Sequence, residues 1–261
     1  MADVLLPMQP LLRAAPLIVS RGNHEDCWRA GNGFFLFMDP RPGTWDDCAP
    51  VAGPDGAPAA PEVVTAPYAI DLPVRAGRTL RLVITDSAPG SDTRITPAST
   101  LMAPQFAAAA RLAAPARGRE SWLVTHRPPF GYVSSTVVAP GGSPWPGDIV
   151  AATRGTLADY RMIVSGHLHF AQMVQIPGQP GQLLLGNGDT RLDPPTGYER
   201  PATGPSGYPA PTSAWTLVEF GYAVALPGRQ AGRWTFRLRD MDGRLQATCA
   251  LAGQQLGCAT P

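Results

Sequence analysis

Short apolar segments that run into loops marked by glycine or proline recur along this 261-residue chain. Segments of this length, bounded by turn residues, are typical of buried strands. Helical patterns are fewer, at Leu5–Ala15, at Pro104–Ala114 and at a helix end near Thr156–Tyr160. Strands are expected at Pro16–Ser20, Ala66–Leu72, Thr79–Thr85, Ser121–Thr125, Arg161–Ser165, Gln172–Ile176, Gln182–Leu185, Trp215–Leu226, Arg233–Arg239 and Arg244–Leu251.

Many strands with few helices indicate an α/β fold, a layered sandwich of two mixed β-sheets flanked by helices. We expect one domain over residues 1–261. Residues 1–190 would form its core and 191–261 would add C-terminal antiparallel strands. The 30 prolines and 28 glycines predict long irregular loops between these elements, notably Pro50–Pro61 and Ser134–Asp148.

The composition and charge of the chain limit which kinds of molecule it can bind. Hydrophobic residues make up 44% of the chain and charged residues 16%, which indicates a globular protein. The formal net charge is +1 without a basic stripe, so we expect neither nucleic acid nor an anionic membrane as the main partner. No apolar run reaches the ~20 residues of a membrane span. No signal peptide is visible, because Asp3 stands where positive charge is wanted and Pro7 and Pro10 interrupt the apolar stretch.

The four cysteines form two pairs that are local in sequence, Cys27 with Cys48 and Cys249 with Cys258. None has the CxxC spacing of a structural zinc site. Two local disulfides would suit a secreted or periplasmic protein, whereas four reduced buried thiols would leave the compartment open.

The chain contains four histidines, and each follows a short apolar strand: His24, His126, His167 and His169. Loops at strand ends are where a rigid scaffold presents reactive groups. Neutral imidazole is a common ligand for zinc and also suits iron and related ions. His167 and His169 are spaced i, i+2, so that both rings project to one side of an extended segment. The four histidines together predict a metal site.

Three sequence blocks carry a resemblance. Gly22-Asn23-His24-Glu25, the strand-terminal His126 and Gly166-His167-Leu168-His169 resemble, in order and approximate spacing, the third to fifth blocks of the calcineurin-like metallophosphoesterases. The resemblance spans roughly Leu11 to Asp189. The C-terminal strands bearing Cys249 and Cys258 resemble tails on secreted bacterial members.

The resemblance implies a metal-dependent phosphatase or phosphodiesterase that acts on a small-molecule or protein phosphoester. In that family two divalent ions (Zn, Mn or Fe) activate a bridging hydroxide that attacks phosphorus. It implies that Asn23, His126 and His167 bind the second metal and that His169 binds the first. His24 would protonate the leaving alkoxide.

For four further side chains near these blocks, the sequence leaves two alternative roles. Glu25 or Asp26 would either orient a histidine or remain solvated. Arg21 and Arg127 would either contact phosphate or serve their loops.

The chain departs from the family pattern at its beginning. Nothing before Arg21 resembles the Asp-x-His and Gly-Asp blocks that supply the first metal and the bridging carboxylate. We therefore expect an incomplete first-metal site, for which Asp86 and Asp189 are candidate replacement ligands, and one bound ion in place of two. The alternative is a non-catalytic remnant that binds one metal ion or acts as an interaction module. A metallo-β-lactamase-like site fails on spacing after His169, and no G-x-S-x-G supports serine chemistry.

Overall fold

The computed structural model describes residues 5–41, 47–49, 51–52, 58–59, 63–92, 95–140, 142–188 and 191–261. The helices are α1 (Leu5–Ala14), α2 (Cys27–Ala30), α3 (Gly33–Phe37), the 3-10 turn η2 (Arg75–Gly77), α4 (Pro97–Ala113) and α5 (Asp148–Ala152). The strands are β1 (Val51–Ala52), β2 (Pro58–Ala59), β3 (Tyr68–Pro73), β4 (Thr79–Thr85), β5 (Arg119–Thr125), β6 (Met162–Ser165), β7 (Ala171–Gln175), β8 (Gly181–Leu185), β9 (Ser213–Leu217), β10 (Gly221–Pro227), β11 (Arg233–Asp240), β12 (Leu245–Ala252) and β13 (Gln255–Ala259).

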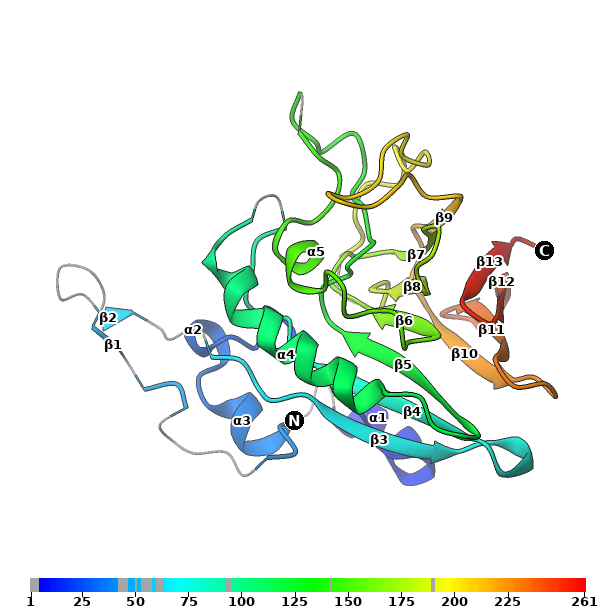
Figure 1. Cartoon of the computed structure of the whole chain (residues 1–261), viewed down its shortest axis with the longest axis horizontal. Coiled ribbons are helices and arrows are strands. Elements are labelled where there is room, and N and C mark those ends of the chain that lie inside the picture. Colours follow the sequence, from blue (N-terminus) through cyan, green and yellow to red (C-terminus); the bar gives the residue numbers. More distant parts are fainter. Residues whose placement is uncertain are drawn as a thin grey trace.

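A seven-stranded mixed sheet forms the middle layer, in the order β3-β4-β5-β6-β8-β7-β9. Strands β4, β5, β6 and β8 run parallel, whereas β3 pairs antiparallel with β4, β7 pairs antiparallel with β8, and β9 pairs antiparallel with β7. The β10-β11-β12-β13 sheet is entirely antiparallel and packs beside the first (Figure 1). The expected layered α/β sandwich is therefore present, with one correction: the second sheet is antiparallel and not mixed.

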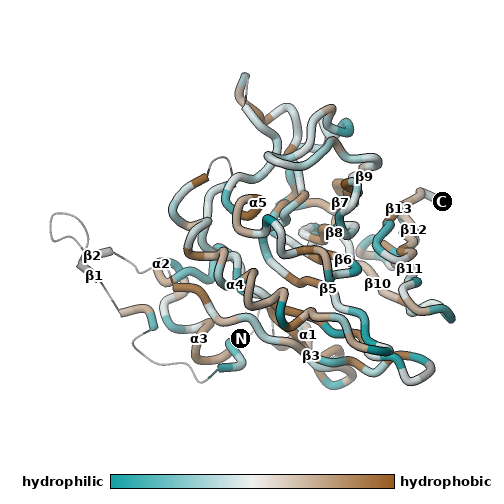
Figure 2. Tube along the Cα trace, viewed as in Figure 1, coloured by the Kyte–Doolittle hydropathy of each residue, from teal (hydrophilic) through white to brown (hydrophobic). Residues whose placement is uncertain are grey.

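The two faces of the central sheet pack against different layers. Successive side chains of a strand point to opposite faces, so one strand contributes to both cores. Leu123 packs with Met102 and Phe106 of α4 and Ile149 of α5 in the first core. Its neighbour Trp122 points the other way, into a second core with residues of β11 and β12. Helices thus cover one face and the second sheet covers the other, and apolar stretches, brown in Figure 2, lie along β5 between them.

Helix α4 begins seven residues before the expected start. Thr96 caps it by accepting a hydrogen bond from the Ala98 amide, and Pro97 follows at the first helical position. Pro104, expected as the leading proline, lies inside the helix. Both Pro97 and Pro104 are residues at which a helix could begin. The helix begins at Pro97 because Thr96 before it supplies the cap.

The expected strand Trp215–Leu226 is wrong as a single element. Its first part is β9, which pairs with β7 in the central sheet, and its second part is β10, which pairs with β11 in the other sheet. Gly221 begins β10 where a Cβ atom would overlap the Arg239 carbonyl oxygen. The chain can therefore cross between sheets here because glycine permits the close approach.

Two smaller expectations also fail. Residues 16–20 form no strand; the carbonyl oxygen of Val19 instead accepts a hydrogen bond from the Tyr68 hydroxyl at 3.1 Å. Residues 156–160 form turns and not a helix end, with the Tyr160 amide bonded to the Leu157 oxygen. By contrast, β3 and β4 pair antiparallel around η2 as expected, as do β7 and β8.

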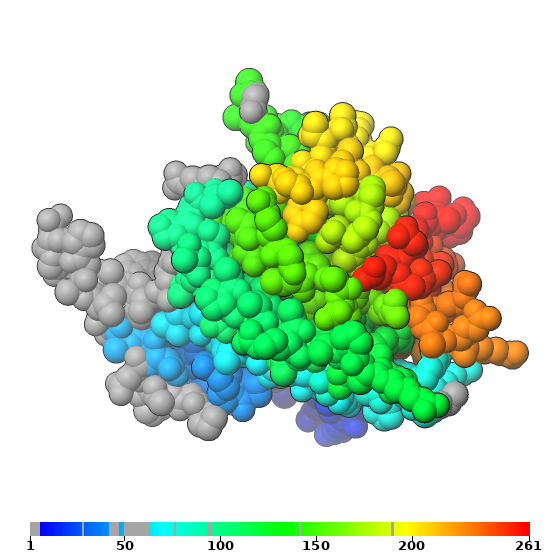
Figure 3. Space-filling model, in the orientation of Figure 1, coloured from blue at the N-terminus to red at the C-terminus, as the bar shows by residue number. Residues whose placement is uncertain are grey.

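The long loops fall largely as expected. Most of Pro50–Pro61 lies outside the described residues, apart from the β1–β2 pair. Residues 135–140, in the loop that follows β5 and precedes α5 in the chain, project from the surface (Figure 3). Within the described part of the chain, no helix is long and apolar enough to cross a bilayer.

The cysteines form two disulfides, Cys27–Cys48 and Cys249–Cys258, so the alternative of four reduced thiols is wrong. Cys249 and Cys258 face each other in register across β12 and β13.

Candidate metal site

Adjacent parallel strands bring His126 and His167 together. β5 and β6 pair in register at Thr125 and Ser165, so the loops that follow them leave the same edge of the sheet. The Gly166 amide donates a hydrogen bond to the His126 carbonyl oxygen at 3.0 Å, which ties the two loops. The carboxyl ends of parallel strands are a recurrent location for functional side chains.

Asn23 reaches the same place from the N-terminal segment. Its neighbour Arg21 forms a buried ion pair with Asp86, which directly follows β4 (Nη1 to Oδ2, 2.9 Å). The Arg21 Nε also donates to the Glu25 carbonyl oxygen at 2.9 Å, and the Glu25 carboxylate accepts from the Gly22 amide. These contacts fold the Gly22–Glu25 loop back on itself beside the strand ends.

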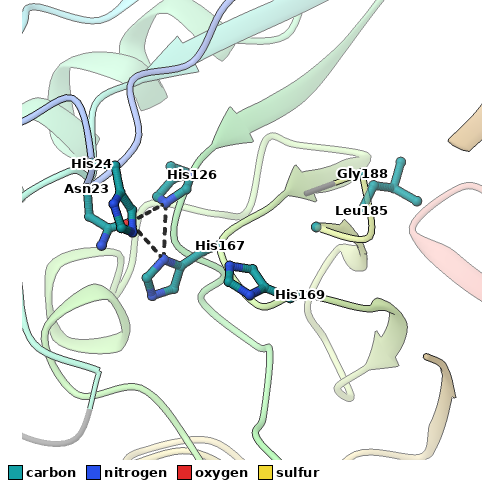
Figure 4. Close-up of a pocket in the computed structure, with 8 residues that line it drawn as sticks. Asn23, His24, His126, His167, His169, Leu185 and Gly188 are labelled. Carbon is teal, nitrogen blue, oxygen red and sulfur yellow. Dashed lines mark hydrogen bonds between the residues drawn. The ribbon is translucent and has the colours of Figure 1, made fainter. Parts of the chain in front are cut away.

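Three potential ligand atoms converge there. Asn23 Oδ1 lies 2.8 Å from His126 Nε2 and 3.2 Å from His167 Nδ1, and the two ring nitrogens are 3.1 Å apart (Figure 4). Bonds of about 2.0–2.1 Å from one ion to such atoms would separate neighbouring ligands by roughly 2.8–3.4 Å. The spacing and the chemistry of this donor set therefore fit a single divalent ion.

Electrostatics keep His126 neutral. Burial is the largest cause, followed by the charges of His167 and Arg127, and together they lower the pKa of His126 to about 3. A neutral imidazole has a lone pair for a metal, whereas imidazolium has none.

The structure adds one acidic residue, Asp92, that the sequence did not predict at this cluster. Asp92 Oδ1 lies 2.9 Å from His167 Nε2 and forms an ion pair with Arg127, whose side chain is buried. Burial raises the pKa of Asp92, but the hydrogen bonds and charges of His167 and Arg127 outweigh it and lower that pKa to about 2. Asp92 follows Gly90 and Ser91 in an ordinary loop sequence, so no motif marks it.

His167 is the one non-glycine residue of the described chain with positive φ, at 76°. This backbone conformation is disfavoured for side chains other than glycine, and it persists where surrounding contacts impose it. In this conformation the His167 Nδ1 atom faces Asn23 and His126.

His24 and His169 share one open pocket with the cluster, of about 460 Å³. Its lining residues are Asn23, His24, His126, His167, His169, Leu185, Gly186 and Gly188. His24 is exposed at the edge of the cluster (Figure 4). The His169 Nδ1 faces the Asp193 carboxylate at 3.8 Å, and its amide bonds the same carboxylate.

The first-metal side is not assembled among the described residues, where no group of three or more His, Cys, Asp or Glu side chains is placed to hold an ion. Asp86 does not line the pocket, because its oxygens accept from Arg21, Thr65 and Ala88. Asp189 lies outside the described residues. The donors that converge are two imidazoles and one amide oxygen.

The arginines and carboxylates next to the motifs make ion pairs and hydrogen bonds that hold their own loops. Arg21 and Arg127 are both buried in ion pairs, which leaves neither exposed to a phosphate. Asp26 caps α2 by accepting from the Arg29 amide, and Glu25 bonds Gly22, so neither orients a histidine.

No family model matches the chain, and no curated protein matches it in sequence. Solved structures with a similar arrangement include GAP50, the anchor in the inner membrane complex of Plasmodium (10% identity, TM-score 0.45, 72% of this chain). They also include the purple acid phosphatase PPD1 from yellow lupin (14%, 0.44, 69%) and PhoD (8%, 0.44, 74%). The chain covers 54%, 31% and 44% of these three structures, respectively, so it spans roughly a third to a half of their lengths.

Proposed function

We propose that this chain is a metal-dependent phosphoester hydrolase, a phosphatase or phosphodiesterase. The convergence of Asn23 Oδ1, His126 Nε2 and His167 Nδ1 within 2.8–3.2 Å carries the proposal. These are three of the four side chains that the motif resemblance assigned to metals. They come together from three separate segments into one open pocket.

A bound divalent ion would polarise a phosphoryl oxygen and lower the pKa of a coordinated water. The chain's own residues supply the rest. Asn23, His126 and His167 hold the ion at the strand ends. His24, exposed in the same pocket, donates a proton to the leaving oxygen. His169 lines the far side of the pocket and completes a first-metal site only with ligands beyond this cluster.

The substrate is a small-molecule or protein phosphoester, and the pocket is open enough to admit it from solvent. The two disulfides support secretion or a periplasmic location, because disulfides persist in oxidising compartments.

A second candidate function is a non-catalytic module that binds one ion. It is favoured by the small donor set, since no group of three or more His, Cys, Asp or Glu side chains among the described residues is placed to hold an ion. Asp92, the acidic side chain nearest the cluster, contacts His167 through the ring nitrogen that faces away from Asn23.

Metal content and turnover test both candidates. We would purify the chain with Zn²⁺ or Mn²⁺, measure bound metal by elemental analysis, and assay p-nitrophenyl phosphate and its bis-ester. One ion per chain with turnover supports the hydrolase, and one ion without turnover supports the binding module. Two ions with turnover would mean that further carboxylates complete the site. No bound ion would contradict both.

Substitutions locate the ion. His126→Ala and His167→Ala should each abolish metal binding. His169→Ala is the matched control and should leave the single ion in place, because its Nδ1 faces Asp193. Equal metal loss in all three variants would contradict the assignment.

A further inference from the structure

The Nε2 atom of His167 lies between two partners of opposite hydrogen-bonding character. Asp92 Oδ1 is 2.9 Å away and Arg127 Nη1 is 3.0 Å away. An ionised carboxylate only accepts hydrogen bonds and a guanidinium only donates them. A hydrogen bond to Asp92 therefore requires a proton on Nε2, whereas one from Arg127 requires Nε2 to be bare.

The choice at Nε2 decides what Nδ1 can do. A neutral imidazole carries one proton, so a protonated Nε2 leaves the Nδ1 lone pair free. Nδ1 is the atom that faces Asn23 Oδ1 and His126 Nε2. If Arg127 donated to Nε2 instead, the proton would lie on Nδ1 and would occupy the position of the ion.

Asp92 satisfies both neighbours at once. Its Oδ1 accepts hydrogen bonds from Arg127 Nη1 and from the His167 ring, so the guanidinium has a better acceptor than the imidazole lone pair. Arg127 is further held by the carbonyl oxygen of Ala88. In the metal-free chain the Nε2 proton of His126 can point to Asn23 Oδ1 and to a bare His167 Nδ1. Binding of an ion at His126 Nε2 requires this proton to move to Nδ1 of the same ring.

We propose that Asp92 is a positioning residue that fixes the Nε2-protonated tautomer of His167 by accepting the hydrogen bond of Arg127 in place of the ring, which frees Nδ1 to bind a divalent ion. The metal-binding part rests on the proposed function. The tautomer part does not, since it is a property of the metal-free chain.

The test has a readout that a merely structural role would not change. Nitrogen-15 NMR of the histidine rings in the metal-free chain reports which nitrogen carries the proton. The unsubstituted chain should show His167 protonated on Nε2. Asp92→Ala should move the proton to Nδ1, because Arg127 then donates to Nε2. Asp92→Asn should do the same, because its amide leaves the guanidinium without an ionised acceptor.

Metal affinity should follow the tautomer. We expect Zn²⁺ affinity, measured by calorimetry, to fall about 10- to 100-fold in Asp92→Ala. Removing the competing donor as well, in Asp92→Ala/Arg127→Met, should recover part of that loss. Asp193→Ala is the matched control, because it removes the carboxylate beside His169 and should change neither the His167 tautomer nor the affinity.

The outcomes separate the two claims. A proton on Nδ1 in the unsubstituted chain, or an unchanged tautomer in both Asp92 variants, would overturn the role of Asp92. An unsubstituted chain that binds no Zn²⁺ would overturn the proposed function, while the ring spectra still decide the tautomer. Asp92 is partly exposed at 42%, so its replacement is compatible with folding, and the amide spectrum of each variant verifies this.

Discussion

Arg21 and Asp86 form an ion pair that is almost wholly buried, with side chains 2% and 0% exposed. The pair joins the segment that carries Asn23 to the end of β4. Arg21 also lies over the Phe35 ring, with its guanidinium carbon 4.6 Å from the ring centroid. The position of Asn23 at the cluster therefore depends on a contact that the sequence places 65 residues away.

We expect Arg21→Met to lower the free energy of unfolding by about 3–5 kcal/mol, because it leaves the Asp86 carboxylate buried without its cation. Urea denaturation measures this loss. Arg29→Met is the control: Arg29 pairs with Asp26 at the surface at 3.8 Å, so its loss should cost about 0–1 kcal/mol. Equal effects of the two substitutions would contradict the structural role of the buried pair.

Gly186 supports the loop that carries His167 and His169. A Cβ atom at this position would overlap the Leu168 carbonyl oxygen, and the Gly186 amide bonds the Phe170 oxygen at 3.1 Å. Gly186→Ala should displace the loop and reduce Zn²⁺ affinity at least tenfold, as measured by calorimetry. Gly257→Ala is the control, since a Cβ there meets nothing within 4 Å. Unchanged affinity in Gly186→Ala would show that the loop tolerates the shift.

Trp234 joins the two sheets. Its ring lies edge-on to Trp122 of the central sheet, with centroids 4.6 Å apart, and its indole nitrogen donates to Glu120 at 2.7 Å. Trp234→Ala should lower the free energy of unfolding by about 3–5 kcal/mol. Tyr222 of β10 is half-exposed, so Tyr222→Ala should change the free energy of unfolding by about 0.5 kcal/mol or less. A small effect at Trp234 would mean that the second sheet contributes little to stability.

His24 separates catalysis from metal binding. His24→Ala should reduce turnover of p-nitrophenyl phosphate by about 10²- to 10⁴-fold, because the leaving oxygen loses its proton donor. Metal content should stay the same, because the converging ligand atoms belong to Asn23, His126 and His167. If the ion is lost together with activity, His24 is a ligand and not an acid.

The sequence singled out three of the residues that the structure brings together, Asn23, His126 and His167. Apolar strands that end in His126 and His167 were visible because a buried strand and the loop after it are local features of the chain. Parallel pairing of β5 and β6 then brings the two loops to one edge. Asn23 joined them in prediction only through the motif resemblance, since nothing local to residues 21–25 specifies what they will contact.

The role of Asp92 and the division of residues 215–226 between β9 and β10 could be recognised only in the folded structure. Asp92 meets His167 across 75 residues and Arg127 across 35, and neither its type nor its neighbours mark it. Residues 215–226 read as one strand because both halves are locally extended.

The sequence by itself determined most of the strand segments, the histidines that follow them and the local spacing of the cysteines, because each depends on residues close together in the chain. Only the tertiary structure decided which sheet each strand enters and which carboxylate the buried His167 meets. Those choices depend on packing and charge compensation between distant segments, and such contacts leave no pattern in a single sequence.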